Sequence, residues 1–256
     1  MKILLTNDDG YLAPGIRMLK EQLEKVGEVY IVAPTHGMSA KSVSLTIGKP
    51  LHIKEEEKNI YSVDGFPADC VALGIEYFKV EKGIEFDLVV SGCNNGLNHS
   101  YDAIYSGTIG ACLEALTYRK KAIAVSCKEN DFDTVKNNFD LMWKFITENN
   151  LISNEYLLNV NFPRGEVKGI KLASEYYRKD DNYFTKTEEG YYAYRYLDDL
   201  SNAPKDSDCY LIKEGYIAVA PLNRSYYSDS LLSKLKIWNN KYILITDIKK
   251  EKKLCH

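Results

Sequence analysis

Residues 1–10 read MKILLTNDDG and give the clearest signal of the fold. Residues 1–5 are short and apolar, which predicts a buried strand, and the adjacent carboxylates Asp8 and Asp9 follow where that strand ends. Open α/β sheets bind their ligands at the carboxyl ends of the strands. Gly10 permits a turn that lets both carboxylates approach one ion. Because two close carboxylates repel each other, the pair predicts a hard cation such as Mg²⁺, Mn²⁺ or Ca²⁺.

The same residues have an alternative interpretation as a plain turn. Asn-Asp-Asp-Gly is ordinary turn composition, and a capped turn without any metal fits it equally well on its own.

The first half of the chain alternates short apolar runs with helical patterns. This alternation predicts an α/β fold whose mainly parallel sheet is covered by helices on both faces. Strands are expected at residues 29–33, 86–91, 122–126 and 157–160, with a small hairpin of residues 51–54 and 60–63. Helices are expected from Pro14 and over residues 67–78, 107–118 and 132–146, and a loop is expected at residues 92–105.

The pattern changes beyond Pro163, where tyrosines are concentrated between Tyr176 and Tyr196 around a Glu-Glu-Gly turn. This predicts a β-hairpin, for which a packed arm or subunit contact is favoured over a surface that stacks nucleobases. Residues 216–220 and 242–248 are expected strands, and residues 229–237 an expected helix. We predict one domain over residues 1–256, with the hairpin arm at about 172–198.

The composition excludes several classes of protein. The 256 residues are 45% hydrophobic and carry a net charge of −3, so no overall attraction to nucleic acid or to an anionic membrane is expected. No apolar run approaches the ~18 residues of a membrane span, and the N-terminus has no signal-peptide pattern, which together favour a cytoplasmic protein.

The cysteines and histidines show no catalytic or zinc-binding spacing. Six cysteines are scattered without a CxxC pair, which favours reduced thiols in the core, and Cys93 is the one expected in a loop. The four histidines form no HxH or HExxH pattern, so zinc is not expected.

Loops that follow parallel strands converge on one edge of the sheet, and this places further polar residues near the carboxylates. Ser39 can offer a hydroxyl oxygen to a cation and Asn95 a carbonyl oxygen, while Ser42 and Ser44 can bind a phosphate. Ser106, Gly107 and Thr108 begin a helix whose free N–H groups can hold a phosphate, although Ser106 is equally suited to be an N-cap. Neither GxxxxGK[ST] nor GxGxxG occurs, so a metal combined with a phosphate is the favoured pairing.

Several longer motifs agree with a known family. They are NDDG at residues 7–10, the A-P…S loop that ends in Ser39, VDGFPADCVALG at 63–74, SGCNNG at 91–96, YSGT at 105–108, NVNFP at 159–163 and GYIAVAPL at 215–222. With these motifs the chain resembles the SurE survival-protein phosphatases, which are metal-dependent nucleotidases. The resemblance implies a Rossmann-like three-layer core, one divalent cation per subunit (Mg²⁺ or Mn²⁺, with Ca²⁺ as a substitute in crystals), and hydrolysis of nucleoside 5′-monophosphates. Homodimers or homotetramers with exchanged C-terminal elements, here at about residues 223–256, are also implied. Because the predicted contacts recognise phosphate and metal more clearly than base, 3′-nucleotides and polyphosphate are expected as further substrates.

The resemblance assigns roles to particular residues. The implied metal ligands are Asp8, Asp9, Ser39 and Asn95, among which Asp8, Asp9 and Asn95 are the implied catalytic groups. The implied phosphate-side residues are Asn7, Ser106, Gly107 and Thr108. The chain departs from the family pattern at Thr35, His36 and Tyr101, and of a usual Asp-Asp pair only Asp102 remains.

The sequence is compatible with two routes of hydrolysis and with one alternative function. Water held by the cation can attack phosphorus with an aspartate assisting proton transfer, or Asp8 can attack directly and form an acyl phosphate. A non-catalytic nucleotide-binding sensor with the same fold is the alternative function.

Overall fold

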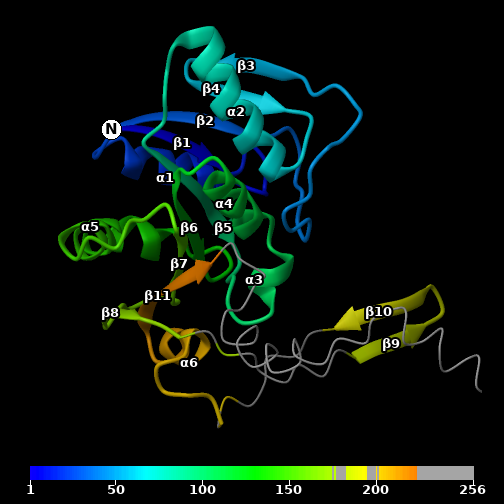
Figure 1. Ribbon diagram of the computed structural model, residues 1–256. Coiled ribbons are helices and arrows are strands. Elements are labelled where there is room, and N and C mark those ends of the chain that lie inside the picture. Colours follow the sequence, from blue (N-terminus) through cyan, green and yellow to red (C-terminus); the bar gives the residue numbers. More distant parts are fainter. Residues whose placement is uncertain (175, 177–182, 195–199, 201, 224–256) are drawn as a thin grey trace, which may run out of the picture. The chain divides into compact units, whose positions relative to one another are not determined.

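The computed structural model describes residues 1–174, 176, 183–194, 200 and 202–223. Within them, a sheet of nine strands has the order β3-β4-β2-β1-β5-β6-β7-β11-β8 (Figure 1). The strands are β1 (Lys2–Thr6), β2 (Glu28–Pro34), β3 (Ile53–Glu57), β4 (Ile60–Val63), β5 (Leu88–Asn95), β6 (Lys121–Cys127), β7 (Tyr156–Phe162), β8 (Gly169–Leu172) and β11 (Tyr216–Asn223). The helices are α1 (Pro14–Leu23), α2 (Pro67–Lys82), α3 (Asp102–Tyr105), α4 (Gly107–Thr117), α5 (Phe132–Glu148) and α6 (Asp208–Lys213).

The middle of the sheet is parallel, as predicted. All neighbours from β4 to β7 run parallel, while β3 is antiparallel to β4 and β11 is antiparallel to β7. The chain passes from β1 to β2 on one side and later enters β5 on the other side of β1. This reversal opens a crevice beyond the carboxyl ends of β1 and β5, which is where ligands bind in sheets of this kind.

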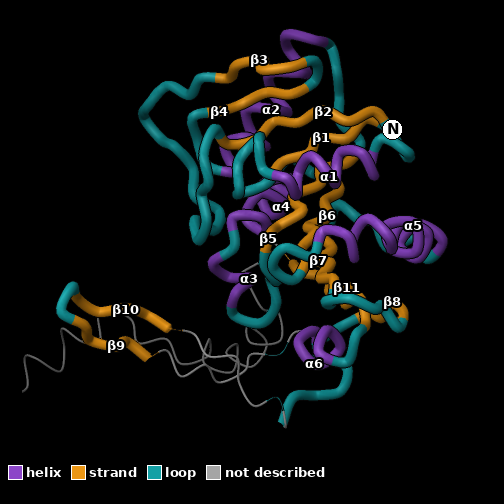
Figure 2. The backbone as a smooth tube through the Cα atoms, turned by 180° about the vertical axis from the view of Figure 1, so that it is seen from behind, coloured by secondary structure: helices purple, strands orange, loops and turns teal. Residues whose placement is uncertain are grey.

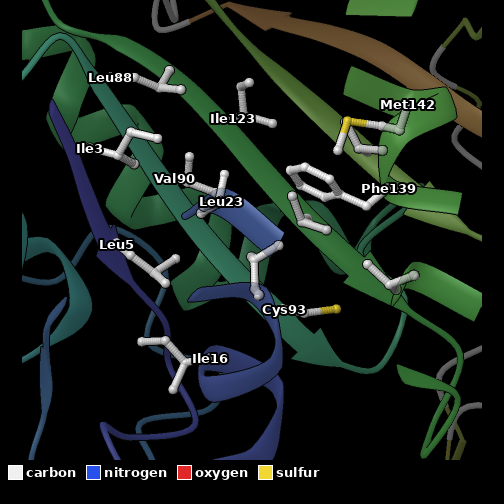
Figure 3. Packing of buried hydrophobic residues seen from close by; sticks show 14 of the residues in the cluster. Ile3, Leu5, Ile16, Leu23, Leu88, Val90, Cys93, Ile123, Phe139 and Met142 are labelled. Carbon is white, nitrogen blue, oxygen red and sulfur yellow. The ribbon is translucent and has the colours of Figure 1, made fainter. Parts of the chain in front are cut away.

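Helices cover both faces of the sheet, so the predicted α/β three-layer architecture is confirmed. One hydrophobic cluster joins α1 and α5 to one face, and the close view of it shows Ile16 and Leu23 of α1 and Phe139 and Met142 of α5 among the side chains of the strands (Figure 3). A second cluster joins α2 and α4 to the opposite face. The two helix layers can be followed from the front and from behind in Figures 1 and 2.

Strand β5 is longer than expected and shortens the predicted loop at residues 92–105. The expected strand 86–91 is observed at Leu88–Asn95, because Asn94 and Asn95 pair with Ser126 and Cys127 at the end of β6. The short helix α3 occupies the far end of the same expected loop. Cys93 therefore does not lie in a loop: it is fully buried in the sheet.

Other boundaries differ for local reasons. The first strand of the small hairpin begins at Ile53 instead of residue 51, and it carries a register shift between Glu55 and Glu57. Helix α2 continues past residue 78 to Lys82 and ends at Gly83, whose φ of 64° suits a glycine. Strand β8 and helix α6 were not expected, since both are short.

The tyrosine-rich segment contains the predicted hairpin, formed by β9 (Tyr183–Thr187) and β10 (Gly190–Tyr194). Its role as an arm stays a prediction. Residues Met1–Asn223 form one compact unit. The helix expected at 229–237, the strand expected at 242–248 and the C-terminal element lie outside the described residues. Among the described residues, no helix has the length and apolar character needed to cross a membrane.

Candidate metal and phosphate site

The turn after β1 is closed by the side chain of Asn7. The Asn7 carboxamide donates to the Gly10 carbonyl at 2.9 Å and accepts from the Gly10 N–H at 3.1 Å. Gly10 has a φ of 101°, a conformation that other residues rarely adopt. Asn7 is fully buried, and its hydrogen bonds fix the backbone that carries Asp8 and Asp9 to the crevice.

Asp8 is buried against the first turn of α4. Its Oδ1 accepts a hydrogen bond from Thr108 Oγ1 at 2.6 Å, and only 4% of the residue is exposed. Burial raises the pKa of Asp8 to about 6; the Thr108 hydroxyl opposes that rise, and the charge of Asp9 adds to it. A Cβ atom on Gly107 would lie 2.8 Å from Asp8 Cβ, so this close approach requires glycine at position 107.

Asp9 lies beside the end of β5. Its Oδ2 accepts from the Asn95 N–H at 3.3 Å. Partial burial raises the pKa of Asp9, and that N–H opposes the rise. The Asn95 side chain is exposed and its Oδ1 accepts from the Asn130 N–H at 2.7 Å, which leaves the second lone pair of that oxygen for another partner.

The loop after β2 carries Ser39 to the same place. The Met38 N–H donates to the Asp8 carbonyl at 2.6 Å, so the loop is attached next to the carboxylates. Ser42 fixes its far side, because its hydroxyl donates to the Ile104 carbonyl at 2.9 Å and its N–H donates to the Tyr105 carbonyl at 3.0 Å. The Ser44 hydroxyl donates within the loop, to Lys41.

These segments enclose one open pocket in the described part of the protein. All four implied metal ligands line it, together with Ser106. The complete lining is Asp8, Asp9, Ser39, Ala40, Asn94, Asn95, Leu97, Asn98, Asp102, Tyr105 and Ser106. The lining contains three carboxylates and no lysine, arginine or histidine. Ser42 and Ser44, which the sequence offered as phosphate contacts, are not part of it.

The remaining phosphate-side candidates lie next to the pocket. Ser106 is the N-cap of α4, as the alternative interpretation expected, since its Oγ accepts from the Ile109 N–H at 3.2 Å. Ser106 also lines the pocket, so the cap and a position beside a ligand are compatible. Asn7, Gly107 and Thr108 are outside the lining: Gly107 and Thr108 contact Asp8, and Asn7 closes the turn.

The donor set fits a hard divalent cation. Two carboxylates, a hydroxyl and an amide oxygen are ligands that Mg²⁺, Mn²⁺ and Ca²⁺ accept. Where the structure is described, no three side chains of His, Cys, Asp or Glu come together as a metal site, so any cation here would need the neutral oxygens of Ser39 and Asn95 as well.

Several lining residues have no role among those predicted from the sequence. Asn94, Asn98 and Tyr105 were inside recognised motifs or loops, and Asp102 was noted only as a departure from the family pattern. Their position in or beside the motifs was the only sign in the sequence that these residues could belong to a site. That they come together in the pocket depends on how residues 96–106 fold back over the sheet.

Comparison with known proteins gives consistent matches over nearly the whole chain. The family described as "Survival protein SurE" matches residues 3–182. The protein named "5′-nucleotidase SurE" of Pelotomaculum thermopropionicum is 36% identical over 251 residues, which cover 92% of this chain and 94% of that protein. The protein of the same name from Petrotoga mobilis is 36% identical and covers 93% of this chain and 99% of its own length. The crystal structure of the SurE protein from Aquifex aeolicus superposes with a TM-score of 0.81 at 32% identity, and the match covers 93% of this chain and 100% of that one.

Proposed function

This chain belongs to the survival protein SurE family, and from that premise we propose that it is a 5′-nucleotidase that hydrolyses nucleoside 5′-monophosphates with the help of one divalent cation per subunit. The nucleotide phosphatase activity rests on relatives that are named 5′-nucleotidases and match over nine-tenths of the chain. Mg²⁺ or Mn²⁺ is the proposed metal, and Ca²⁺ is the substitute expected in crystals.

The charge of the pocket is the observation that carries metal dependence. Asp8, Asp9 and Asp102 line it, and no cationic side chain is in the lining. A phosphate monoester is an anion, so such a pocket would repel it unless a cation intervened. The proposed ligands are Asp8, Asp9, Ser39 and Asn95.

A cation bound there would neutralise phosphoryl oxygens and lower the pKa of a water molecule. Asp8 suits a fixed ligand, because Thr108 donates to its Oδ1 at 2.6 Å and a Cβ at position 107 would lie only 3.0 Å from its Oδ2. Asp9 is less buried and faces the pocket, so we assign to it the transfer of the proton from the attacking water. A covalent aspartyl phosphate detected at Asp8, or a stable adduct of Asp8 with a fluoride analogue of phosphate, would contradict this route and favour direct attack by Asp8.

The phosphate would lie at the start of α4. Ser106 lines the pocket and begins a helix of eleven residues, whose N-terminus favours an anion. In this proposal Ser106 and the Gly107 N–H contact the phosphate, whereas Thr108 and Asn7 act through Asp8 and the turn. These contacts recognise phosphate more than base, so 3′-nucleotides and polyphosphate are proposed as further substrates.

We also propose a cytoplasmic homodimer or homotetramer. The free, buried state of Cys70, Cys93, Cys112, Cys127 and Cys209 agrees with a reducing compartment. The C-terminal element at about 223–256 is the proposed oligomerisation segment.

The test is phosphate release from AMP, GMP, a 3′-nucleotide and polyphosphate, each with Mg²⁺, Mn²⁺ or EDTA. Release from the 5′-nucleotides that EDTA abolishes is the expected result. Asp9→Asn should lose it, and Asp133→Asn, an exposed carboxylate on α5, should keep it. Binding of AMP without release from any substrate would contradict the proposal and favour the nucleotide sensor.

A further inference from the structure

Two asparagines on β7 lie in the buried part of the sheet, where apolar side chains are the rule. Asn159 and Asn161 are each only 1% exposed, and they alternate with Val160, which packs in the α1 and α5 core. Their side chains therefore share the other face of the strand. Ser126 of β6 pairs in register with Asn161 and is fully buried. Buried polar groups of this kind are costly unless they are hydrogen-bonded.

The partner of all three is one residue of the pocket lining, Asn98. The Asn98 N–H donates to Asn161 Oδ1 at 2.8 Å, and the Asn98 carbonyl accepts from Asn161 Nδ2 at 3.0 Å. Asn159 Nδ2 donates to the same carbonyl at 2.7 Å. The Asn98 side chain donates to Ser126 Oγ at 2.9 Å. Asn161 thus binds both backbone polar groups of Asn98, as a neighbouring strand would.

The attachment continues along the segment toward the phosphate side. The Ser100 N–H donates to Asp208 Oδ2 at 3.1 Å, and Asp208 is buried in the first turn of α6. The segment of residues 97–101 is therefore attached to β6 and β7 at Asn98 and to α6 at Ser100. The chain then enters α3 and reaches Tyr105 and Ser106 in the pocket.

The metal side of the pocket is held by other contacts. The turn of Asn7 carries Asp8 and Asp9, the Met38 N–H attaches the loop of Ser39, and Asn95 is held by pairing with β6 and by Asn130. The two halves touch, because Ser42 in the loop of Ser39 donates to Ile104 and Tyr105 and because Thr108 donates to Asp8. The side chains of Asn159 and Asn161, however, bond to Asn98 and to each other and to no proposed metal ligand. The asparagines of β7 therefore support the half without the carboxylate pair.

We infer that Asn161, assisted by Asn159, is a positioning residue that sets residues 97–106 over the substrate phosphate without contributing to metal affinity. The inference rests on the proposed nucleotidase activity. A displacement of about 1 Å in groups that orient a substrate can reduce the rate by ~100-fold.

The test compares Asn161→Ala with Asn138→Ala. Asn138 lies on α5, and its Nδ2 likewise donates to a backbone carbonyl, that of Thr134, at 2.9 Å, away from the pocket. Steady-state kinetics with AMP, calorimetric titration with Mn²⁺ and amide hydrogen exchange are measured on each variant. Asn161→Ala should lower kcat by about 10-fold to 100-fold, keep the Kd for Mn²⁺ within about twofold, and speed exchange at residues 97–101. Asn138→Ala should leave kcat and that exchange unchanged.

Ser126→Ala provides a milder variant if Asn161→Ala fails to fold. It removes one acceptor of the Asn98 side chain, and we expect the same direction with a kcat loss of only about threefold. An unchanged kcat in folded Asn161→Ala or Ser126→Ala would overturn the inference, and so would a parallel loss of Mn²⁺ affinity. If the wild-type protein released no phosphate, the proposed function would fail, whereas the exchange at residues 97–101 would still report whether Asn161 holds this segment.

Discussion

Among single residues, Asp9 is the one whose substitution should weaken metal binding and catalysis while the protein still folds. Asp9→Asn keeps the shape of the side chain and removes one of two neighbouring charges. We expect weaker Mn²⁺ binding and a rate reduced by about 100-fold or more, with partial recovery at high Mn²⁺ concentration. Phosphate release is measured against Mn²⁺ concentration, beside Asp133→Asn. Turnover equal to that of the wild type at limiting metal would refute the assignment of Asp9 as a ligand.

Asp8 makes the metal-free protein sensitive to pH. Burial, opposed by Thr108 and reinforced by the charge of Asp9, raises the pKa of Asp8 from 3.8 to about 6. The folded state then holds the proton more tightly than the unfolded chain. The stability that this group contributes is therefore present below a pH of about 4 and is lost as pH rises through about 6.

Replacing Asp8 by asparagine should remove that loss. In EDTA at a pH of about 7.5, Asp8→Asn should have a free energy of unfolding roughly 1–3 kcal/mol above that of the wild type, with no such advantage at a pH of about 4. Urea denaturation at the two pH values provides the measurement. A difference that did not change with pH would show that the Asp8 carboxylate is not strained by burial.

The hydroxyl of Thr108, on α4, opposes the rise in the pKa of Asp8 that burial causes. Thr108→Val removes the hydroxyl that donates to Asp8 at 2.6 Å and nearly keeps the volume, so the pKa of Asp8 should rise further. Because a cation must displace the proton, the apparent Mn²⁺ affinity at a pH of about 6.5 should fall several-fold and recover at higher pH. Thr117→Val, whose hydroxyl donates to the Glu114 carbonyl, is the matched control. A loss of affinity that persisted unchanged at high pH would argue against this coupling.

Among the helices and strands, the start of α4 can approach the turn after β1 closely because Gly107 has no side chain. In Gly107→Ala the new Cβ would lie 2.8 Å from Asp8 Cβ and 3.0 Å from Asp8 Oδ2, so Asp8 or the helix must move. We expect a loss of phosphatase activity of about 10-fold or more. Gly37→Ala is the control, since its Cβ would have only Asp9 O within 4 Å, at 3.8 Å. Equal activities of the two variants would contradict the importance of this contact.

The elements that the sequence predicted well are those with strong periodicity or a clear breaker. Helix α1 starts at Pro14 and α5 spans the striped segment from Phe132, because proline and the apolar spacing are local signals. The extension of β5 through Asn95 was missed, since polar residues there pair with β6 only in the assembled sheet. Helix α6, with six residues, lacks the length for a periodic pattern.

In the molecule as a whole, segments that lie far apart in the chain come together at one pocket. The sequence predicted only part of this arrangement. The parallel topology and the family motifs correctly brought Asp8, Asp9, Ser39 and Asn95 to one pocket. The support of residues 97–101 by β7 was missed, because NVNFP was visible as a motif without showing which backbone its asparagines bind. Long-range hydrogen bonds of this kind have no spacing rule in the sequence.

The assembly proposed for the whole molecule has a direct measurement. The chain has a mass of 29.2 kDa, and light scattering after size-exclusion chromatography should give twice or four times that value. We expect a dimer or tetramer at micromolar concentration, because the resemblance to the SurE family implies that copies of this chain associate. A mass equal to that of one chain would contradict the proposed oligomer while leaving the site of each subunit intact.

We propose that a divalent cation held by Asp8, Asp9, Ser39 and Asn95 is required for hydrolysis of a nucleoside 5′-monophosphate. A single titration of EDTA-treated wild-type protein, in which Mn²⁺ binding and phosphate release from AMP are followed together, tests this requirement. We expect no phosphate release before Mn²⁺ is added, and then a rate that rises in parallel with occupancy of one site per subunit. Full activity in the metal-free protein, or a filled site without any release, would contradict it.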